Sequence, residues 1–454
     1  MDTTVRSMFS HVQRLPNELL AEIFLYYHEA VVHSYPHPNL PPPLLLTQIC
    51  STWRHVAHGM PKLWTTFSLD ANSQVTTRKA DHVSFAKAWL SRAQPHPLCV
   101  SLSINTTDQA FNRIVDAILP SADRLQDLRL YLPISHFRPL LNLAVGSMAL
   151  LESVELSVMP SVYNQEATYW TKKITAFARA PRLRSVALFS CDVDALYCNI
   201  QMPWSQLTKL FISESYQILN TSYRDVFLQC TNLVDCTLYV NAWEEWDVPD
   251  VPIVVLPHLR RLVVTFIDHG RSSPFFQPLN LPALKDLTVA TTDGCAWSQP
   301  IFMELTLRSS LDLEQLYFDH LEINPDALLQ LLPHMKSLIK LHINLSKCIN
   351  DNLFDALCYR GMDGQHLAPK LEILDVYGFT GYDIDHNGIA NMIESRWWTD
   401  DAPRMVSRLK TVAVGFYDRE IDAGVRERLE HCSREGLSLT LPLSKKLREE
   451  PPST

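Results

Sequence analysis

Residues 125–130 read LQDLRL, and residues 151–156 repeat the pattern as LESVEL. An aliphatic residue is followed by two free positions, an apolar residue, one free position and a second apolar residue. Successive copies start 24 to 38 residues apart. Eleven copies begin at Leu125, Leu151, Leu183, Leu207, Leu233, Leu259, Leu284, Leu313, Leu338, Leu371 and Leu409. The spacing predicts stacked units of one kind, because a single unit cannot bury its own apolar face.

Helical patterns separate the copies, which gives the order strand, turn, helix and return. Residues 98–104 alternate apolar and polar side chains and predict a strand, and residues 78–92 predict an amphipathic helix that precedes it. The helical stretches between strands are Phe111–Leu119, Trp170–Ala180, Tyr223–Cys230, Pro325–Leu332 and Asn387–Trp398.

These units resemble the leucine-rich repeat family over residues 100–441. The resemblance implies an α/β solenoid with parallel strands on its concave face and helices on its convex face. The asparagine that usually follows the strand is mostly missing, so the repeats are irregular. An ordinary α/β domain with parallel strands is the alternative.

Alternate residues of a strand face opposite sides of the sheet, so the polar positions of each copy face solvent. Aromatic residues interleaved with charges suit protein recognition, and the use of this fold in other proteins favours it by analogy. A merely solvated sheet face is the alternative. The predicted target-binding residues are Arg129, Tyr131, Phe189, Phe211, Tyr239, Arg261, Tyr317, His342 and Tyr377.

The N-terminal part reads LPNELLAEIF over residues 15–24, LLTQICSTWR over 45–54 and PKLW over 61–64. Apolar residues recur at spacings of three and four in the first two stretches, which predicts short helices. About 60 residues bury only a small core, so much of this apolar surface is left for another protein.

These three fragments, in this order, resemble the F-box over residues 11–70. The proline-rich segment 28–43 is longer than an F-box turn and reads as an inserted loop. The resemblance implies docking to a Skp-type adaptor and, through it, to a cullin. Some of the following residues must pack inward instead, and the sequence does not sort them: Leu15, Pro16, Glu18, Leu19, Ile23, Phe24, Leu46, Ile49, Cys50, Trp53 and Arg54.

The predicted organisation is an F-box-like domain (11–70), a linking helix (71–97), the solenoid (98–441) and a tail (442–454). Apolar residues make up 46% of the 454 residues and the net charge is −9, which favours a globular chain and argues against general nucleic-acid binding. With no signal pattern and no long apolar run, we expect a soluble cytoplasmic or nuclear protein without membrane contact.

No catalytic motif, phosphate-binding loop or zinc-type cysteine spacing occurs, so we expect no catalytic residue, cofactor or metal. Asp383, Asp385, Asn387, Gly388 and Glu394 match a calcium-loop spacing, although no helix is expected to enter it. Capping of the following helix is the favoured interpretation.

The two resemblances together imply a substrate-recognition adaptor of a Skp–cullin–F-box ubiquitin ligase, itself non-catalytic. The alternative is a leucine-rich repeat scaffold whose F-box-like segment serves a complex unrelated to ubiquitin transfer. An enzyme hidden in the irregular repeats would require converging ionisable residues.

We predict that Leu15→Ala combined with Pro16→Ala abolishes pull-down of the Skp-type adaptor while the solenoid stays folded. Circular dichroism checks the fold of the variant. Undiminished pull-down would refute the docking assignment.

Overall fold

The computed structural model describes most of the chain and divides it into two compact units, residues 1–203 and 204–454, which are treated separately below. The described residues are 15–32, 41–70, 82–104, 111, 113–159, 173–190, 200–214, 226–240, 252–267, 272–292, 297–321, 323–344, 349–361, 366–379, 384–399, 404–416 and 420–441.

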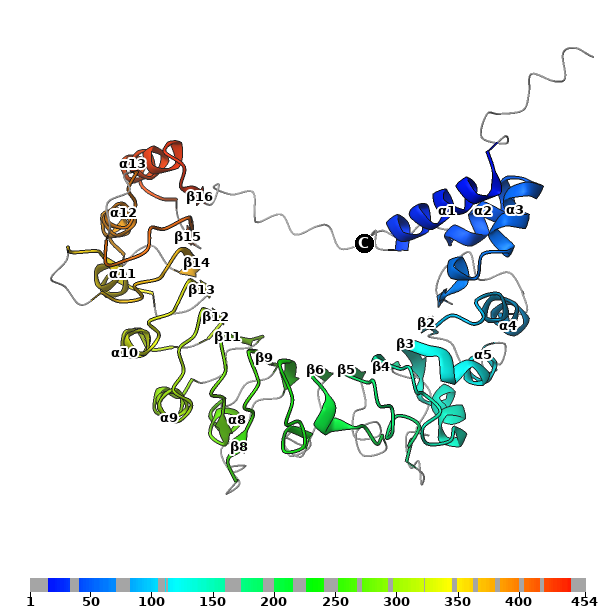
Figure 1. Ribbon diagram of the computed structural model, residues 1–454. Coiled ribbons are helices and arrows are strands. Elements are labelled where there is room, and N and C mark those ends of the chain that lie inside the picture. Colours follow the sequence, from blue (N-terminus) through cyan, green and yellow to red (C-terminus); the bar gives the residue numbers. More distant parts are fainter. Residues whose placement is uncertain are drawn as a thin grey trace, which may run out of the picture. The chain divides into compact units, whose positions relative to one another are not determined.

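The first unit begins with a helical region and continues into parallel strands (Figure 1). The helical region consists of α1 (Asn17–Val32), α2 (Pro42–Ile49), α3 (Ser51–His58) and the 3-10 helix η2 (Pro61–Trp64). The strands, each paired with the next, are β1 (Thr66–Asp70), β2 (Leu98–Ser103), β3 (Leu125–Pro133), β4 (Ser153–Met159) and β5 (Ser185–Ser190). Between them lie α4 (His82–Arg92), α5 (Ile114–Ile118), η3 (Leu119–Arg124) and η4 (Ile134–Asn142).

The second unit repeats strand and helix in alternation, and its helices α8–α13 lie on one side of the strands (Figure 1). The paired parallel strands are β6 (Lys209–Glu214), β7 (Asp235–Val240), β9 (Arg261–Phe266), β11 (Asp286–Thr291), β12 (Gln315–Asp319), β13 (Lys340–Asn344), β14 (Ile373–Phe379), β15 (Thr411–Phe416) and β16 (Ser438–Thr440). A separate parallel pair joins β8 (Val254–Val255) to β10 (Leu279–Asn280). The helices are η6 (Trp204–Gln206), α8 (Ser273–Phe276), α9 (Gln299–Ser309), α10 (Pro325–Leu331), η7 (Leu332–His334), α11 (Asp351–Leu357), α12 (His386–Ser395) and α13 (Ala423–Arg434).

This architecture is an irregular leucine-rich repeat solenoid with a small helical region at its N-terminus, and it confirms the predicted fold class. All eleven predicted copies contain a strand, and so does the segment predicted at 98–104. Four described strands, β1, β16 and the two-residue strands β8 and β10, were not predicted as such. Because β1 pairs with β2, the sheet begins at Thr66, inside the predicted F-box-like range.

One predicted helix, Trp170–Ala180, is wrong where the structure describes it. Residues 173–180 form turns, and Ile174 makes an isolated parallel bridge with Ile200. Ile174 and Phe177 are fully buried. The apolar spacing that resembled a helix therefore serves a buried turn.

The core of the second unit is a set of aligned aliphatic rows. Leu287, Leu316, Leu341 and Leu374 stand in register on four successive strands, and none of them has solvent exposure. Burying one leucine side chain stabilises a protein by roughly 2 kcal/mol. Each leucine in the row is covered by its counterparts on the two neighbouring strands, which is why the repeats fold only as an array.

Side-chain caps fix the starts of three successive helices in this unit. The side-chain oxygen of Asn324 accepts the N–H of Asp326 at 2.9 Å, and that of Asn350 accepts the N–H of Leu353 at 3.2 Å. Asp385 begins α12 in the same way, accepting the N–H of Asn387 at 2.9 Å. The polar residues that open each helix thus satisfy backbone groups that the helix leaves unpaired.

Arg396 follows α12 and is fully buried without a carboxylate partner among the described residues. It donates to the backbone carbonyls of Leu357 (2.6 Å), Leu367 (2.5 Å) and Ala368 (3.0 Å). Burial lowers the pKa of Arg396 to about 10. The side chain therefore ties the end of α11 and the turn before β14 to the end of α12.

We expect Arg396→Met to destabilise the protein by about 3 kcal/mol, because two buried carbonyls and one partly buried carbonyl would lose their donor. Urea unfolding followed by circular dichroism measures this. Arg360→Met is the control, since Arg360 is exposed and its ion pair is with the equally exposed Asp355. Equal stability of the two variants would show that the Arg396 contacts are not stabilising.

Candidate protein-binding surfaces

The helical region has a small core of its own. Leu20 and Phe24 on α1 are fully buried, and Leu46 on α2 is 5% exposed. The ring centroids of Phe24 and Trp53 lie 4.9 Å apart, which joins α1 to α3. Phe24 and Leu46 are therefore packing residues, although the sequence offered both as adaptor contacts.

A different set of large apolar side chains on the same helices faces solvent. Residues three and four apart share a helix face, so this set forms one stripe on α1 and another on α2. The exposed fractions are 47% for Leu19, 47% for Ile23, 78% for Tyr26, 36% for Leu45 and 56% for Ile49. We call these five residues, on both helices together, the apolar stripe.

The remaining predicted adaptor contacts are spread between surface and interior. Leu15, Cys50 and Trp53 are half-buried, and Pro16, Glu18 and Arg54 are exposed. The Nε of Arg54 donates to the carbonyl of Thr47 at 2.8 Å, which links α3 to α2.

Sequence reasoning left Tyr26 and Leu45 out of the predicted contacts. Helical spacing carries the missing signal, since Tyr26 follows Ile23 by three positions and Leu45 precedes Ile49 by four.

Cys50 has a specific structural role. It lies between α2 and α3 with an extended backbone, and its Sγ accepts the N–H of Trp53 at 3.4 Å. Cys50 therefore caps α3 and aligns its first turn beside α2.

The segment Pro61–Trp64 fastens the helical region to the elements that follow. Leu63 and Trp64 are buried, and the Nε1 of Trp64 donates to the carbonyl of Ala57 at 2.8 Å. In turn, the Nε1 of Trp89 on α4 donates to the carbonyl of Trp64 at 2.8 Å, and the two rings lie 4.8 Å apart. Trp64 and Trp89 are thus buried in the core, whereas the apolar stripe on α1 and α2 stays exposed.

The sheet face of the first unit carries a polar group on β3 and β4. Arg129 contacts Asp127 at 3.0 Å and Glu155 at 3.7 Å, and the hydroxyl of Tyr131 donates to Glu155. Burial and this hydrogen bond raise the pKa of Tyr131. Phe189 lies on β5, two strands further along the sheet, in the register row that contains Tyr131.

In the second unit, the predicted face residues form two separate groups. Near its start, the rings of Phe211 and Tyr239 lie 5.9 Å apart, and Arg261 pairs with Asp235 at 3.3 Å. On β9 the register row of Phe211 continues with Val263, which is aliphatic and not aromatic. The aromatic pair of Phe211 and Tyr239 therefore ends before the later strands.

The second group lies on β12–β14. The His342 ring is 5.5 Å from that of Tyr317 and 5.9 Å from that of Tyr377. Asp375 contacts the Nζ of Lys340 at 3.2 Å and His342 at 3.5 Å. Burial alone would raise the pKa of Asp375, but hydrogen bonds from His342 and Lys340 lower it. Lys340 and Asp375 therefore belong to the same group as the predicted residues Tyr317, His342 and Tyr377, although neither was among the predicted target-binding residues.

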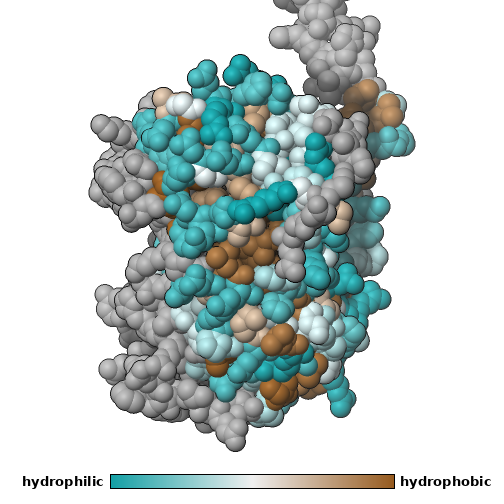
Figure 2. Space-filling view, turned by 90° about the vertical axis from the view of Figure 1, so that its left-hand side faces the viewer, coloured by the Kyte–Doolittle hydropathy of each residue, from teal (hydrophilic) through white to brown (hydrophobic). Residues whose placement is uncertain are grey.

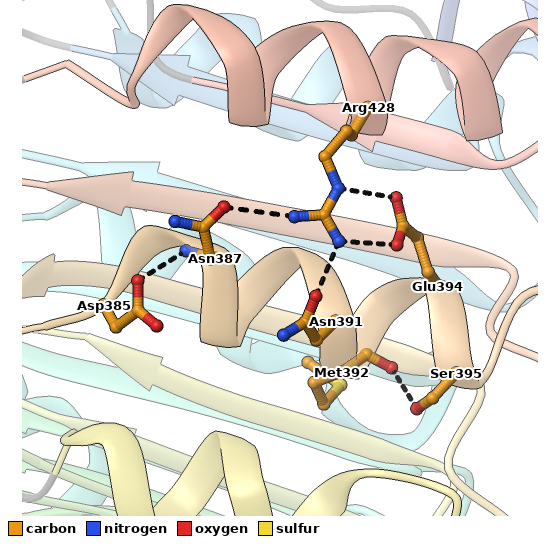
Figure 3. Close-up of polar contacts among 7 residues, drawn as sticks. All are labelled: Asp385, Asn387, Asn391, Met392, Glu394, Ser395 and Arg428. Carbon is orange, nitrogen blue, oxygen red and sulfur yellow. Dashed lines mark hydrogen bonds and ion pairs between the residues drawn. The ribbon is translucent and has the colours of Figure 1, made fainter.

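The calcium-loop alternative is not supported by the geometry around α12 (Figure 3). Both carboxylate oxygens of Glu394 accept from Arg428, at 3.0 and 2.7 Å, and Arg428 also donates to Asn387 at 3.2 Å. Asp385 caps the helix, as the sequence favoured, while Asp383 lies outside the described residues. Within the described part of the chain no three metal-binding side chains converge, and no helix is long and apolar enough to cross a membrane.

Comparisons with known proteins add little. No protein-family model matches the chain, and no curated protein matches it. Among solved structures, a chain of the crystal structure of a Rad7 and Elc1 complex in yeast aligns at 16% identity, covering 85% of this chain and 95% of that chain, with a TM-score of 0.32. At that TM-score the likeness supports no argument about function.

We predict that Cys50→Ala destabilises the helical region by about 1 kcal/mol through loss of the cap, whereas Cys50→Ser retains it, because a hydroxyl oxygen accepts the same N–H. Thermal unfolding compares the two variants. Equal loss in both would mean that the thiol acts through packing and not as a cap.

Proposed function

We propose that the chain is the substrate-recognition adaptor of a Skp–cullin–F-box type ubiquitin ligase. The observation that carries the proposal is the apolar stripe on α1 and α2, next to a core that Phe24 and Leu46 already fill. The F-box resemblance covers the same helices, and it supplies the identity of the partner.

The energetics favour a partner on this stripe. Fully burying one large aliphatic side chain stabilises by about 1.5–3 kcal/mol, so covering the exposed parts of the four aliphatic side chains and of Tyr26 would add a large contribution. In the docking we propose, Leu19, Ile23 and Ile49 form the centre of the contact with the Skp-type adaptor. Central apolar anchors of this kind dominate binding energy at protein interfaces.

The solenoid would hold the target protein. Its sheet face presents the aromatic and charged groups around Tyr131, Tyr239 and Tyr317, whose backbones are fixed by pairing to neighbouring strands. Binding both the adaptor and the target on one chain raises the effective concentration of target lysines at the transfer site. The chain itself would perform no bond chemistry.

The test is co-purification of the Skp-type adaptor and a cullin with the wild type and with Ile23→Asp/Ile49→Asp. We expect the double variant to lose both partners, with adaptor affinity reduced by at least about 100-fold, since two charges would be buried at the contact centre. Both side chains are about half exposed, so the unfolding temperature should stay close to that of the wild type.

Leu307→Asp is the matched control, because Leu307 is 62% exposed on α9 in the second unit. It should keep both partners. Capture of the adaptor without a cullin would favour the scaffold alternative, and unchanged capture by the double variant would refute the stripe as the docking site.

A further inference from the structure

Two tryptophans directly after α12 form a stacked group with two arginines. The Cζ of Arg408 lies 5.2 Å from the ring centroid of Trp397, and that of Arg404 lies 4.2 Å from the ring of Trp398. The Nε1 of Trp397 donates to the carboxylate of Glu435 at 3.1 Å. Both rings stay half-buried, so they are held in place at the surface and not enclosed in the core.

This group continues into a row of cations from successive repeats. The N–H of Ser407 donates to the carbonyl of Pro369 at 2.7 Å, which brings Arg408 beside Lys370. The Nζ of Lys370 donates to the hydroxyl of Ser337 at 3.4 Å, which brings it beside Lys336. The three cations therefore occupy the edge where β13, β14 and β15 begin, and neighbouring strands lie about 5 Å apart.

The charges in this row are only partly offset within the described part of the chain, where the Asp312 carboxylate acts on Lys370 from beyond ion-pair distance. Their neighbours Lys340 and Lys410 pair with Asp375 at 3.2 Å and Glu372 at 2.7 Å. Lys336, Lys370 and Arg408 have no carboxylate at ion-pair distance among the described residues, and all three are exposed. The three cations lie in the turns just before adjacent strands, so an anion on this edge would relieve their mutual repulsion.

An exposed apolar side chain lies in the segment that leads into β15, three residues before Arg408. Met405 lies between the two stacked arginines in the sequence and is 61% exposed. Tryptophan, arginine and methionine are the residues enriched at protein interfaces. Figure 2 shows one side of the second unit, where hydrophilic residues cover most of the described surface and hydrophobic residues gather in separate patches. An apolar contact within a polar surround is the usual anatomy of such an interface.

We propose that Lys336, Lys370, Trp397, Met405 and Arg408, which we call the basic edge, bind an acidic segment of a second protein. A guanidinium stacked on an indole ring is oriented so that its remaining N–H groups can take a carboxylate. Nucleic acid fits less well, because the chain carries a net charge of −9 and the basic edge holds a single row of three cations. This surface is distinct from both surfaces used in the proposed ligase function.

The test measures fluorescence anisotropy of a short labelled peptide of alternating glutamate and serine with a central leucine, titrated with the full-length protein. We expect saturable binding that weakens with salt, and at least about tenfold weaker binding to Lys370→Glu/Arg408→Glu. Met405→Ser should weaken binding about threefold without changing its salt dependence. The charge-matched control is Lys87→Glu/Arg113→Glu, two exposed positions in the first unit, which should bind as the wild type does.

Three results would overturn the proposal. They are equal binding of a peptide with glutamine in place of glutamate, equal weakening by the control variant, and tighter binding of a mixed-sequence single-stranded RNA than of the acidic peptide. Unfolding midpoints of all variants are measured first. Because Met405→Ser removes no charge and lies at the surface, it keeps the test decisive if charge reversal disturbs the fold.

Discussion

The structure depends on one constraint, namely that no repeat can bury its own aliphatic side chains. The register of Leu287, Leu316, Leu341 and Leu374 shows the solution, since each strand is covered by the next and contributes to one continuous row. Helices then cover one face of the strands and leave the other face to polar and aromatic side chains. That free face is fixed by backbone pairing, so its side chains are presented on a rigid surface.

The N-terminal helical region buries a smaller share of its apolar side chains than the repeats do. Its core is small, with Phe24, Leu46 and Trp53 at its centre, and Trp64 and Trp89 fasten it to the following elements. The region is too small to enclose all of its apolar side chains, so one face of α1 and one face of α2 remain in water. The apolar stripe is a consequence of that size, and it is the surface that we propose as the docking site of the adaptor.

Much of the fold could be predicted from the sequence, because the spacing of apolar residues depends on which side chains are buried. The alternating aliphatic positions gave all eleven repeat strands, and the helix spacing gave the apolar faces near the N-terminus. Periodicity could not decide which face of α1 turns inward, since Ile23 and Phe24 are equally apolar and only the position of Trp53 settles it. It also missed β1 and β16, which stand at the ends of their units, and β8 and β10, which have only two residues each. The group around Lys340 and Asp375 depends on strand register, which no single stretch of sequence encodes.

The central claim is that the N-terminal helices are incomplete without a second protein, whereas the repeats are complete alone. Hydroxyl-radical footprinting, with and without a Skp-type adaptor, tests this most directly. In the isolated protein we expect oxidation of Tyr26, Ile23 and Ile49 but not of Phe24, and in the complex we expect the first three to become protected. Protection of Tyr26 and Ile23 in the isolated protein, or their continued oxidation in the complex, would contradict the claim.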